Sequence, residues 1–158
     1  AAARRDQQRL EELKAAMLAA KIGYWPSQAD FQIKTIAAWT AYAEHRHEEG
    51  LRLMREAADM EEASDKHPVT PGNVVPSRQL LAEMLMEDGK PSDALVEFRR
   101  SLARDPNRYH TIAGAARAAL AAGDKAAAQK YVDQLLSVAA NADTRRSELA
   151  EASTRSGK

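Results

Sequence analysis

Apolar residues recur at three- and four-residue steps along most of the chain, with polar residues between them. In the first segment Leu10, Leu13 and Met17 form one such stripe. This spacing puts apolar side chains on one face of an α-helix. The pattern predicts helices over residues 4–22, 26–44, 48–64, 77–88, 92–104, 109–122, 124–139 and 144–152. In the third of these we expect Leu51, Met54, Ala57, Ala58 and Met60 to face inward.

Glycine and proline residues separate the predicted helices. Gly23 and Pro26 end the first one, with Gly23 expected at its C-terminal cap. Pro68, Pro71, Gly72 and Pro76 interrupt the helical pattern between residues 66 and 76. Because proline lacks the backbone N–H that a helix interior needs, this segment is expected to be a loop.

Two stretches of the chain repeat each other with a period of 34 residues. Gly89 and Gly123 stand 34 residues apart, and so do Ala94 and Ala128. A third copy is recognisable upstream if His45 stands at the glycine position and an insertion of about ten residues is allowed. A fixed period of this size predicts stacked helical hairpins that bury each other's apolar faces.

The composition supports this architecture and narrows the function. The chain has 158 residues, of which 23 are Lys or Arg and 23 are Asp or Glu, so its net charge is near zero. Nucleic acids and acidic membranes select basic surfaces, so we expect neither as a partner. Cysteine is absent, which excludes thiolate chemistry and disulfides within this sequence. No apolar stretch is long enough to span a membrane.

The repeated residues resemble the tetratricopeptide repeat signature. Gly89, Ala94, Phe98 and Pro106, with Leu81, Ala82 and Leu85 before them, match one copy, and an alanine-rich second copy runs from Ala115 to Ala128. The chain departs from the signature at three positions: Gly50 stands where the signature has alanine, His45 where it has glycine, and Ala140 where it has proline. Residues 66–136 are also similar to the C-terminal end of long bacterial tetratricopeptide proteins of uncharacterised function, which suggests a fragment of a longer protein.

The resemblance implies an all-α, right-handed superhelix of about seven or eight helices. We expect a single domain, 1–158, made of a leading helix (1–26), three hairpins (27–65, 77–108 and 109–141), a proline-rich insertion (66–76) and a capping helix with a tail (142–158). It also implies protein binding on the concave side, which the first helix of each hairpin lines. The candidate residues there are Trp39, Tyr42, Gln79, Glu83, Met86, His110 and Arg117.

Two interpretations of these candidates remain open. In the first, Trp39 and Tyr42 form an aromatic end of a binding groove. In the second, both pack against the first helix and Arg117 pairs with Glu83. The insertion offers a further candidate, since His67 and Thr70 could face a ligand, although the loop could equally serve only as a connection.

Other chemistry has little support in the sequence. His45 and His47 suggest a metal site, but zinc sites usually need three or four ligands, so we expect no metal. Glu61 and Glu62 are expected on a solvated helix face. Neither a nucleophile elbow nor a phosphate-binding loop is present, so we expect no enzyme and no cofactor.

The leading hypothesis is therefore a scaffold that binds a protein segment. Alternatives are self-association or docking to the rest of a longer chain through Leu10, Leu13 and Met17 of the first helix, and a small-molecule site near the proline-rich loop. The partner remains unidentified. The compartment is open too, although a soluble protein of the bacterial cytoplasm or periplasm is expected.

Overall fold

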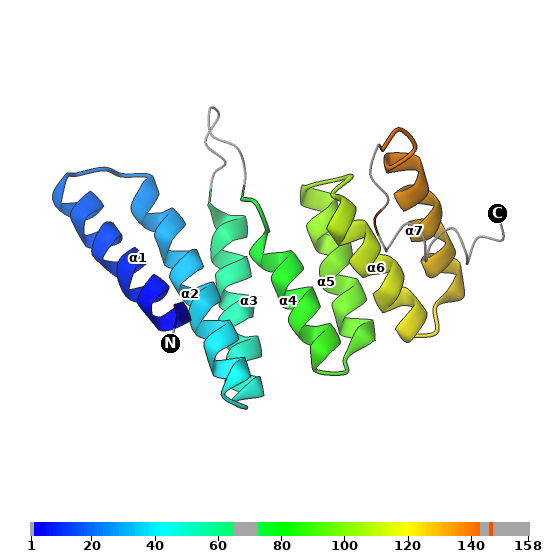
Figure 1. The fold of residues 1–158 in the computed structure, drawn as a ribbon, viewed down its shortest axis with the longest axis horizontal. Helices are drawn as coiled ribbons and strands as arrows, with labels where there is room; N and C mark the ends of the chain where they lie inside the picture. Colours follow the sequence, from blue (N-terminus) through cyan, green and yellow to red (C-terminus); the bar gives the residue numbers. More distant parts are fainter. Residues whose placement is uncertain (1, 65–72, 143–145, 147–158) are drawn as a thin grey trace. The chain divides into compact units, whose positions relative to one another are not determined.

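The computed structural model describes residues 2–64, 73–142 and 146. Within them the chain forms seven α-helices and no strand (Figure 1). The helices are α1 (Ala2–Ala19), α2 (Trp25–Ala43), α3 (His47–Ala63), α4 (Ser77–Glu87), α5 (Pro91–Arg104), α6 (Tyr109–Ala121) and α7 (Lys125–Val138). The predicted all-α class is confirmed. The closing helix expected at 144–152 lies outside the described residues, apart from Arg146.

The chain divides into two compact units, Ala1–Leu81 and Ala82–Lys158, and the boundary falls inside α4. In the first unit α2 packs against both α1 and α3. The core of this unit contains Ala29, Phe31, Ala38, Ala41, Leu51, Met54, Ala57, Ala58 and Leu81. Met60, expected to face inward, is 38% exposed, so that prediction was wrong. Met60 lies near the end of α3, beyond the last buried residue of that helix.

The first helix, α1, contributes no buried residue. Leu13 and Leu18 are exposed, and the contact of α1 with α2 includes two ion pairs, Arg4 with Glu44 and Lys14 with Asp30. Ion pairs between partly exposed side chains contribute little to stability. The attachment of α1 to α2 therefore buries none of the α1 side chains fully and gains little from its ion pairs.

In the second unit α6 packs against both α5 and α7. Its core combines the large residues Met84, Leu85, Phe98, Ile112 and Leu135 with many alanines. Phe98 of α5 lies directly against Gly114 of α6, where a Cβ atom on Gly114 would come within 2.4 Å of the phenyl ring. Phe98 therefore fills space between α5 of one hairpin and α6 of the next. Two helices approach closely where one of them lacks a side chain.

The three hairpin turns share one backbone conformation. His45, Gly89 and Gly123 have φ angles of 64°, 70° and 78°, in the left-handed region. In each turn the next residue donates its N–H to the carbonyl five residues back, as Arg46 does to Ala41 at 3.0 Å. This arrangement satisfies carbonyl groups at the helix end. The structure thus confirms His45 as the counterpart of the two turn glycines.

A close helix contact also explains the glycine at position 50. A Cβ atom on Gly50 would lie 2.9 Å from the Ala38 carbonyl oxygen and 3.0 Å from the Tyr42 Cβ. Because the Ala38 oxygen is a backbone atom, any side chain at position 50 would force α2 and α3 to move apart. Gly50 occupies the repeat position of Ala94 and Ala128, which are also buried.

The end of α1 differs from the sequence expectation. Lys21, not Gly23, adopts the left-handed conformation, with φ 56°, and the N–H of Ile22 bonds to the Met17 carbonyl. The helix therefore ends earlier than predicted, at Ala19. Glycine is only the easiest residue to place at such a cap, and hydrogen bonds from a lysine-centred turn can close a helix equally well.

Replacing His45 by glycine should raise the free energy of unfolding by about 0.5–1 kcal/mol, because a non-glycine residue in this conformation costs about 1–2 kcal/mol and the glycine's greater freedom when unfolded offsets part of the gain. Urea denaturation followed by circular dichroism would measure the change. Gly89→Ala provides the reverse control. A Cβ atom there meets nothing within 4 Å, so its expected loss of about 1 kcal/mol is purely conformational. A loss of stability in His45→Gly would contradict this account.

Candidate functional site

The first-unit candidates Trp39 and Tyr42 are half-buried on α2. Their rings meet edge to face with centroids 5.9 Å apart, and Tyr42 stacks on His47 with centroids 4.3 Å apart. His45 stacks on His47 in turn, at 6.2 Å. The four rings form a continuous aromatic cluster at the turn between α2 and α3, whose two histidines are exposed. This cluster offers a rigid, partly accessible apolar surface.

Gln79, the remaining candidate of the first unit, is only 4% exposed. The exposure expected of it is not observed, because the start of α4 lies against α3 and α2, where Ser77 hydrogen-bonds to Glu61 and Thr35. Ser77 and Arg78 beside it are buried as well. His67 and Thr70 of the proline-rich insertion lie outside the described residues.

The second-unit candidates are more accessible. Glu83 and Met86 of α4 are half-buried, whereas His110 and Arg117 of α6 are exposed. Within 73–142 and at 146, Arg117 makes no ion pair, so the expected pair with Glu83 is not formed. Leu120, one turn further along α6, is 43% exposed. Arg117 and Leu120 follow His110 by seven and ten residues, so the three side chains lie on the same side of α6.

His110 and its neighbour Tyr109 contact a residue from beyond α7. The Arg146 guanidinium lies over the Tyr109 ring, 5.2 Å from its centroid, and its Nη1 atom is 3.3 Å from Nε2 of His110. A cation over an aromatic ring is attracted by the ring's electron-rich face. Arg146 thus lies beside the N-terminal end of the face that carries Arg117.

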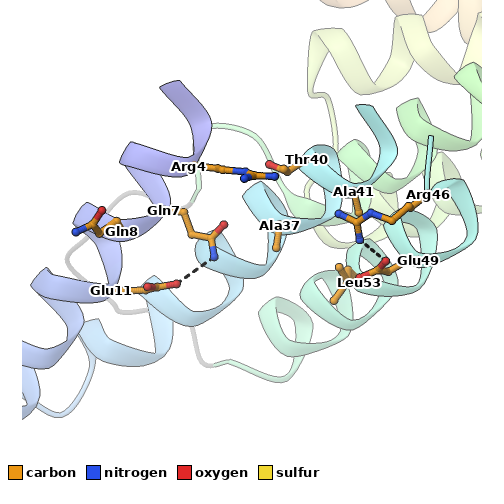
Figure 2. A pocket seen from close by; sticks show the side chains of 10 residues that line it. All are labelled: Arg4, Gln7, Gln8, Glu11, Ala37, Thr40, Ala41, Arg46, Glu49 and Leu53. Carbon is orange, nitrogen blue, oxygen red and sulfur yellow. Dashed lines mark hydrogen bonds and ion pairs between the residues drawn. The ribbon is translucent and has the colours of Figure 1, made fainter. Parts of the chain in front are cut away.

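An open cavity of about 390 Å³ lies in the first unit among α1, α2 and α3 (Figure 2). Its lining is Arg4, Gln7, Gln8, Glu11, Ala37, Thr40, Ala41, Arg46, Glu49 and Leu53. None of these residues was a sequence candidate. The cavity combines side chains from three helices, so no spacing within one helix signals it.

Two arginines beside this cavity hold one carboxylate. Nη2 of Arg4 donates to Oε1 of Glu44, and Nη2 of Arg46 lies 2.6 Å from Oε2. Arg46 also pairs with Glu49. The hydrogen bonds from Arg46 and then Arg4 hold the pKa of Glu44 below its usual value. The hydrogen bonds to Glu44 and then Glu49 raise the pKa of Arg46.

A second electrostatic cluster ties the start of α4 to α3. The Arg78 guanidinium, 4% exposed, binds both oxygens of Glu62 at 2.8 and 2.6 Å and Oδ1 of Asp59 at 2.6 Å. Glu61 accepts the backbone N–H of Ser77 at 2.6 Å, at the N-terminus of α4. The expectation that Glu61 and Glu62 are merely solvated was therefore wrong, because residues distant in sequence supply their partners. A carboxylate at a helix N-terminus is also favoured by the helix dipole.

Candidate metal ligands do not gather in the part of the chain that the structure describes. His45 and His47 lie in the aromatic cluster instead. Of the helices over the described ranges, none is both long enough and apolar enough to cross a bilayer.

The repeated hairpins, with their common turn and close helix contacts, define a helical-repeat protein. Residues 85–152 match the family described as Tetratricopeptide repeat. The match begins at Leu85, near the end of α4, and spans all of α5, α6 and α7. A search of curated proteins finds no match. Tetratricopeptide repeats generally mediate protein–protein interaction and are typically non-enzymatic.

Proposed function

We propose that this protein is a scaffold that binds a protein segment through the exposed faces of the first helices of its hairpins. The observation that carries the proposal is the α6 face of His110, Arg117 and Leu120. It combines an exposed cation without an ion pair among the described residues and an exposed leucine. Arginine beside apolar surface is typical of residues that dominate binding energy in protein interfaces. We expect no catalysis by this chain alone.

The first unit offers a second such face in Trp39 and Tyr42. Their edge-to-face contact fixes both rings, so a partner would meet a surface that loses little side-chain freedom on binding. Both residues are only half-buried, which leaves part of each ring accessible. A partner of this face would be apolar or aromatic, whereas a partner of the α6 face would carry a carboxylate for Arg117.

Arg117→Glu should weaken partner capture by the full chain at least tenfold, because it replaces the exposed cation with a repelling charge. Quantitative pull-down followed by mass spectrometry would measure the loss. Lys130→Glu is the matched control, since Lys130 is an exposed cation on α7, the second helix of the same hairpin. Equal partner profiles for wild type and Arg117→Glu, or equal losses in both variants, would remove the α6 face from the proposal.

Self-association through α1 is the second candidate function. The exposure of Leu13 at 41% and Leu18 at 57%, on a helix without a buried residue, favours it. Light scattering over a range of protein concentrations would distinguish the two functions, because only self-association raises the mass with concentration.

A further inference from the structure

The cavity among α1, α2 and α3 lies on a different side of α2 from Trp39 and Tyr42. Ala37, Thr40 and Ala41 face the cavity, and the 100° rotation per residue places them opposite the two aromatic residues. With a volume of about 390 Å³ it has the size of small-ligand sites in proteins. It is therefore a separate site from the face of α2 that carries Trp39 and Tyr42.

Apart from the two arginines, nothing described around Glu44 stabilises its negative charge. It is the C-cap residue of α2, where the negative end of the helix dipole disfavours a carboxylate. Its own oxygens accept hydrogen bonds only from Arg4 and Arg46 among the described residues. Its side chain is also 39% exposed, so it can turn out into water without crossing the core.

The cavity also holds polar groups that remain unused. Nε and Nη1 of Arg4 have no hydrogen-bond partner among the described residues, and neither does the buried Oγ1 of Thr40. Figure 2 shows the Arg4 side chain extending from α1 toward Thr40 on α2. A buried hydroxyl without a partner is costly, so a ligand that bonds to it gains free energy.

The charges of the lining favour a ligand with one negative charge. Arg4 and Arg46 are balanced by Glu11 and Glu49, so the cavity as a whole is neutral. A group with two negative charges, such as phosphate, would be repelled by these carboxylates. The two guanidinium groups are already placed on the two oxygens of one planar carboxylate, and charge-assisted hydrogen bonds of this kind are among the strongest that arginine makes.

We propose that this cavity binds a carboxylate-bearing ligand, which displaces Glu44 from Arg4 and Arg46 and accepts a hydrogen bond from Thr40. Ala37, Ala41 and Leu53 contact the apolar part of the ligand. Glu44 acts as an internal competitor that occupies the two arginines until the ligand arrives. The carboxylate can belong to a glutamate or aspartate side chain of a peptide or to a small free acid, because both present the same planar group.

Titration of the full chain with the peptide acetyl-Gly-Glu-Gly-amide, followed by backbone amide NMR shifts around Thr40, tests the site. The peptide with glutamine in place of glutamate is the ligand control, and butyrate, which carries a single carboxylate, represents a free acid. Arg4→Gln should weaken binding about fivefold or more, because it removes one of the two guanidinium groups. Glu44→Gln should tighten binding about threefold to tenfold, because it removes the competing charge.

Arg5→Gln is the matched protein control, since Arg5 is exposed on the same helix and does not line the cavity. Thermal melts of all variants would show whether they keep the fold. Tighter binding of the glutamate peptide than of butyrate would identify a peptide source, and the reverse would identify a free acid. The proposal fails if neither carboxylate ligand shifts the amide resonances around Thr40, or if the glutamine peptide binds as tightly as the glutamate peptide. It also fails if Glu44→Gln does not tighten binding of the carboxylate ligand.

Discussion

Gly114→Ala should lower the free energy of unfolding by about 2 kcal/mol. The new Cβ atom would come within 2.4 Å of the Phe98 ring, and that ring is fully buried. Overpacking of a well-packed core costs up to about 3 kcal/mol, whereas the better helix propensity of alanine returns about 1 kcal/mol. The steric cost therefore decides the sign. Urea denaturation monitored by circular dichroism would measure the loss.

Two variants separate this steric effect from a general effect of replacing glycine. Gly23→Ala is the matched control, because a Cβ atom at Gly23 meets nothing within 4 Å. Phe98→Leu removes part of the ring that Gly114→Ala would strike, so the double variant should be at least about 1 kcal/mol more stable than the sum of the two single changes implies. If the losses of unfolding free energy from the two single changes simply added in the double variant, the clash between the new Cβ atom at position 114 and the Phe98 ring would not be the cause of the destabilisation.

Arg78→Ala is expected to destabilise the protein by about 3 kcal/mol. Removing one partner of a buried ion pair costs about 3–5 kcal/mol, because the other charge is left without compensation. The lower end applies here, since Asp59 is 67% exposed and can be hydrated, whereas Glu62 at 28% cannot be hydrated fully. The same change also removes a buried side chain from the start of α4. The free energy of unfolding from urea denaturation is the measurement.

Arg52→Ala is the appropriate comparison for Arg78→Ala. Arg52 pairs with Glu56 four residues away on the same helix, but its side chain is 59% exposed. Pairs of this kind stabilise a helix by about 0.3–0.5 kcal/mol. Burial, not the number of ion pairs, should therefore separate the two variants. Similar losses for both arginines would contradict the role assigned to the α3–α4 cluster.

The helices and their turns could be predicted because they depend on residues close in sequence. The apolar period located all seven described helices, with differences of a few residues at their ends. The 34-residue repeat identified His45 as a turn residue, although positive φ is uncommon for residues other than glycine, and the structure confirms that conformation. Gly23 is the exception, because several residue types can close a helix and hydrogen bonds select among them.

The candidate site was only partly predictable. Sequence reasoning placed His110 and Arg117 on α6, and both are exposed. It also placed Gln79 on an accessible surface, whereas Gln79 is buried. The period of a helix shows which residues share a face, but other segments decide which faces they cover. At the start of α4, Glu61 and Glu62 from α3 bind Ser77 and Arg78, and this enclosure has no local signal.

The sequence by itself determined the helical class, the repeat and the turns, because backbone hydrogen bonds and apolar periodicity act over a few residues. Only the tertiary structure decided that Phe98 requires a glycine at position 114 and that Arg4 and Arg46 share the carboxylate of Glu44. The first contact joins two helices, and the bond from Arg4 to Glu44 joins residues 40 positions apart. Their existence depends on distances of a few ångströms between packed helices, and no one-dimensional pattern contains those distances.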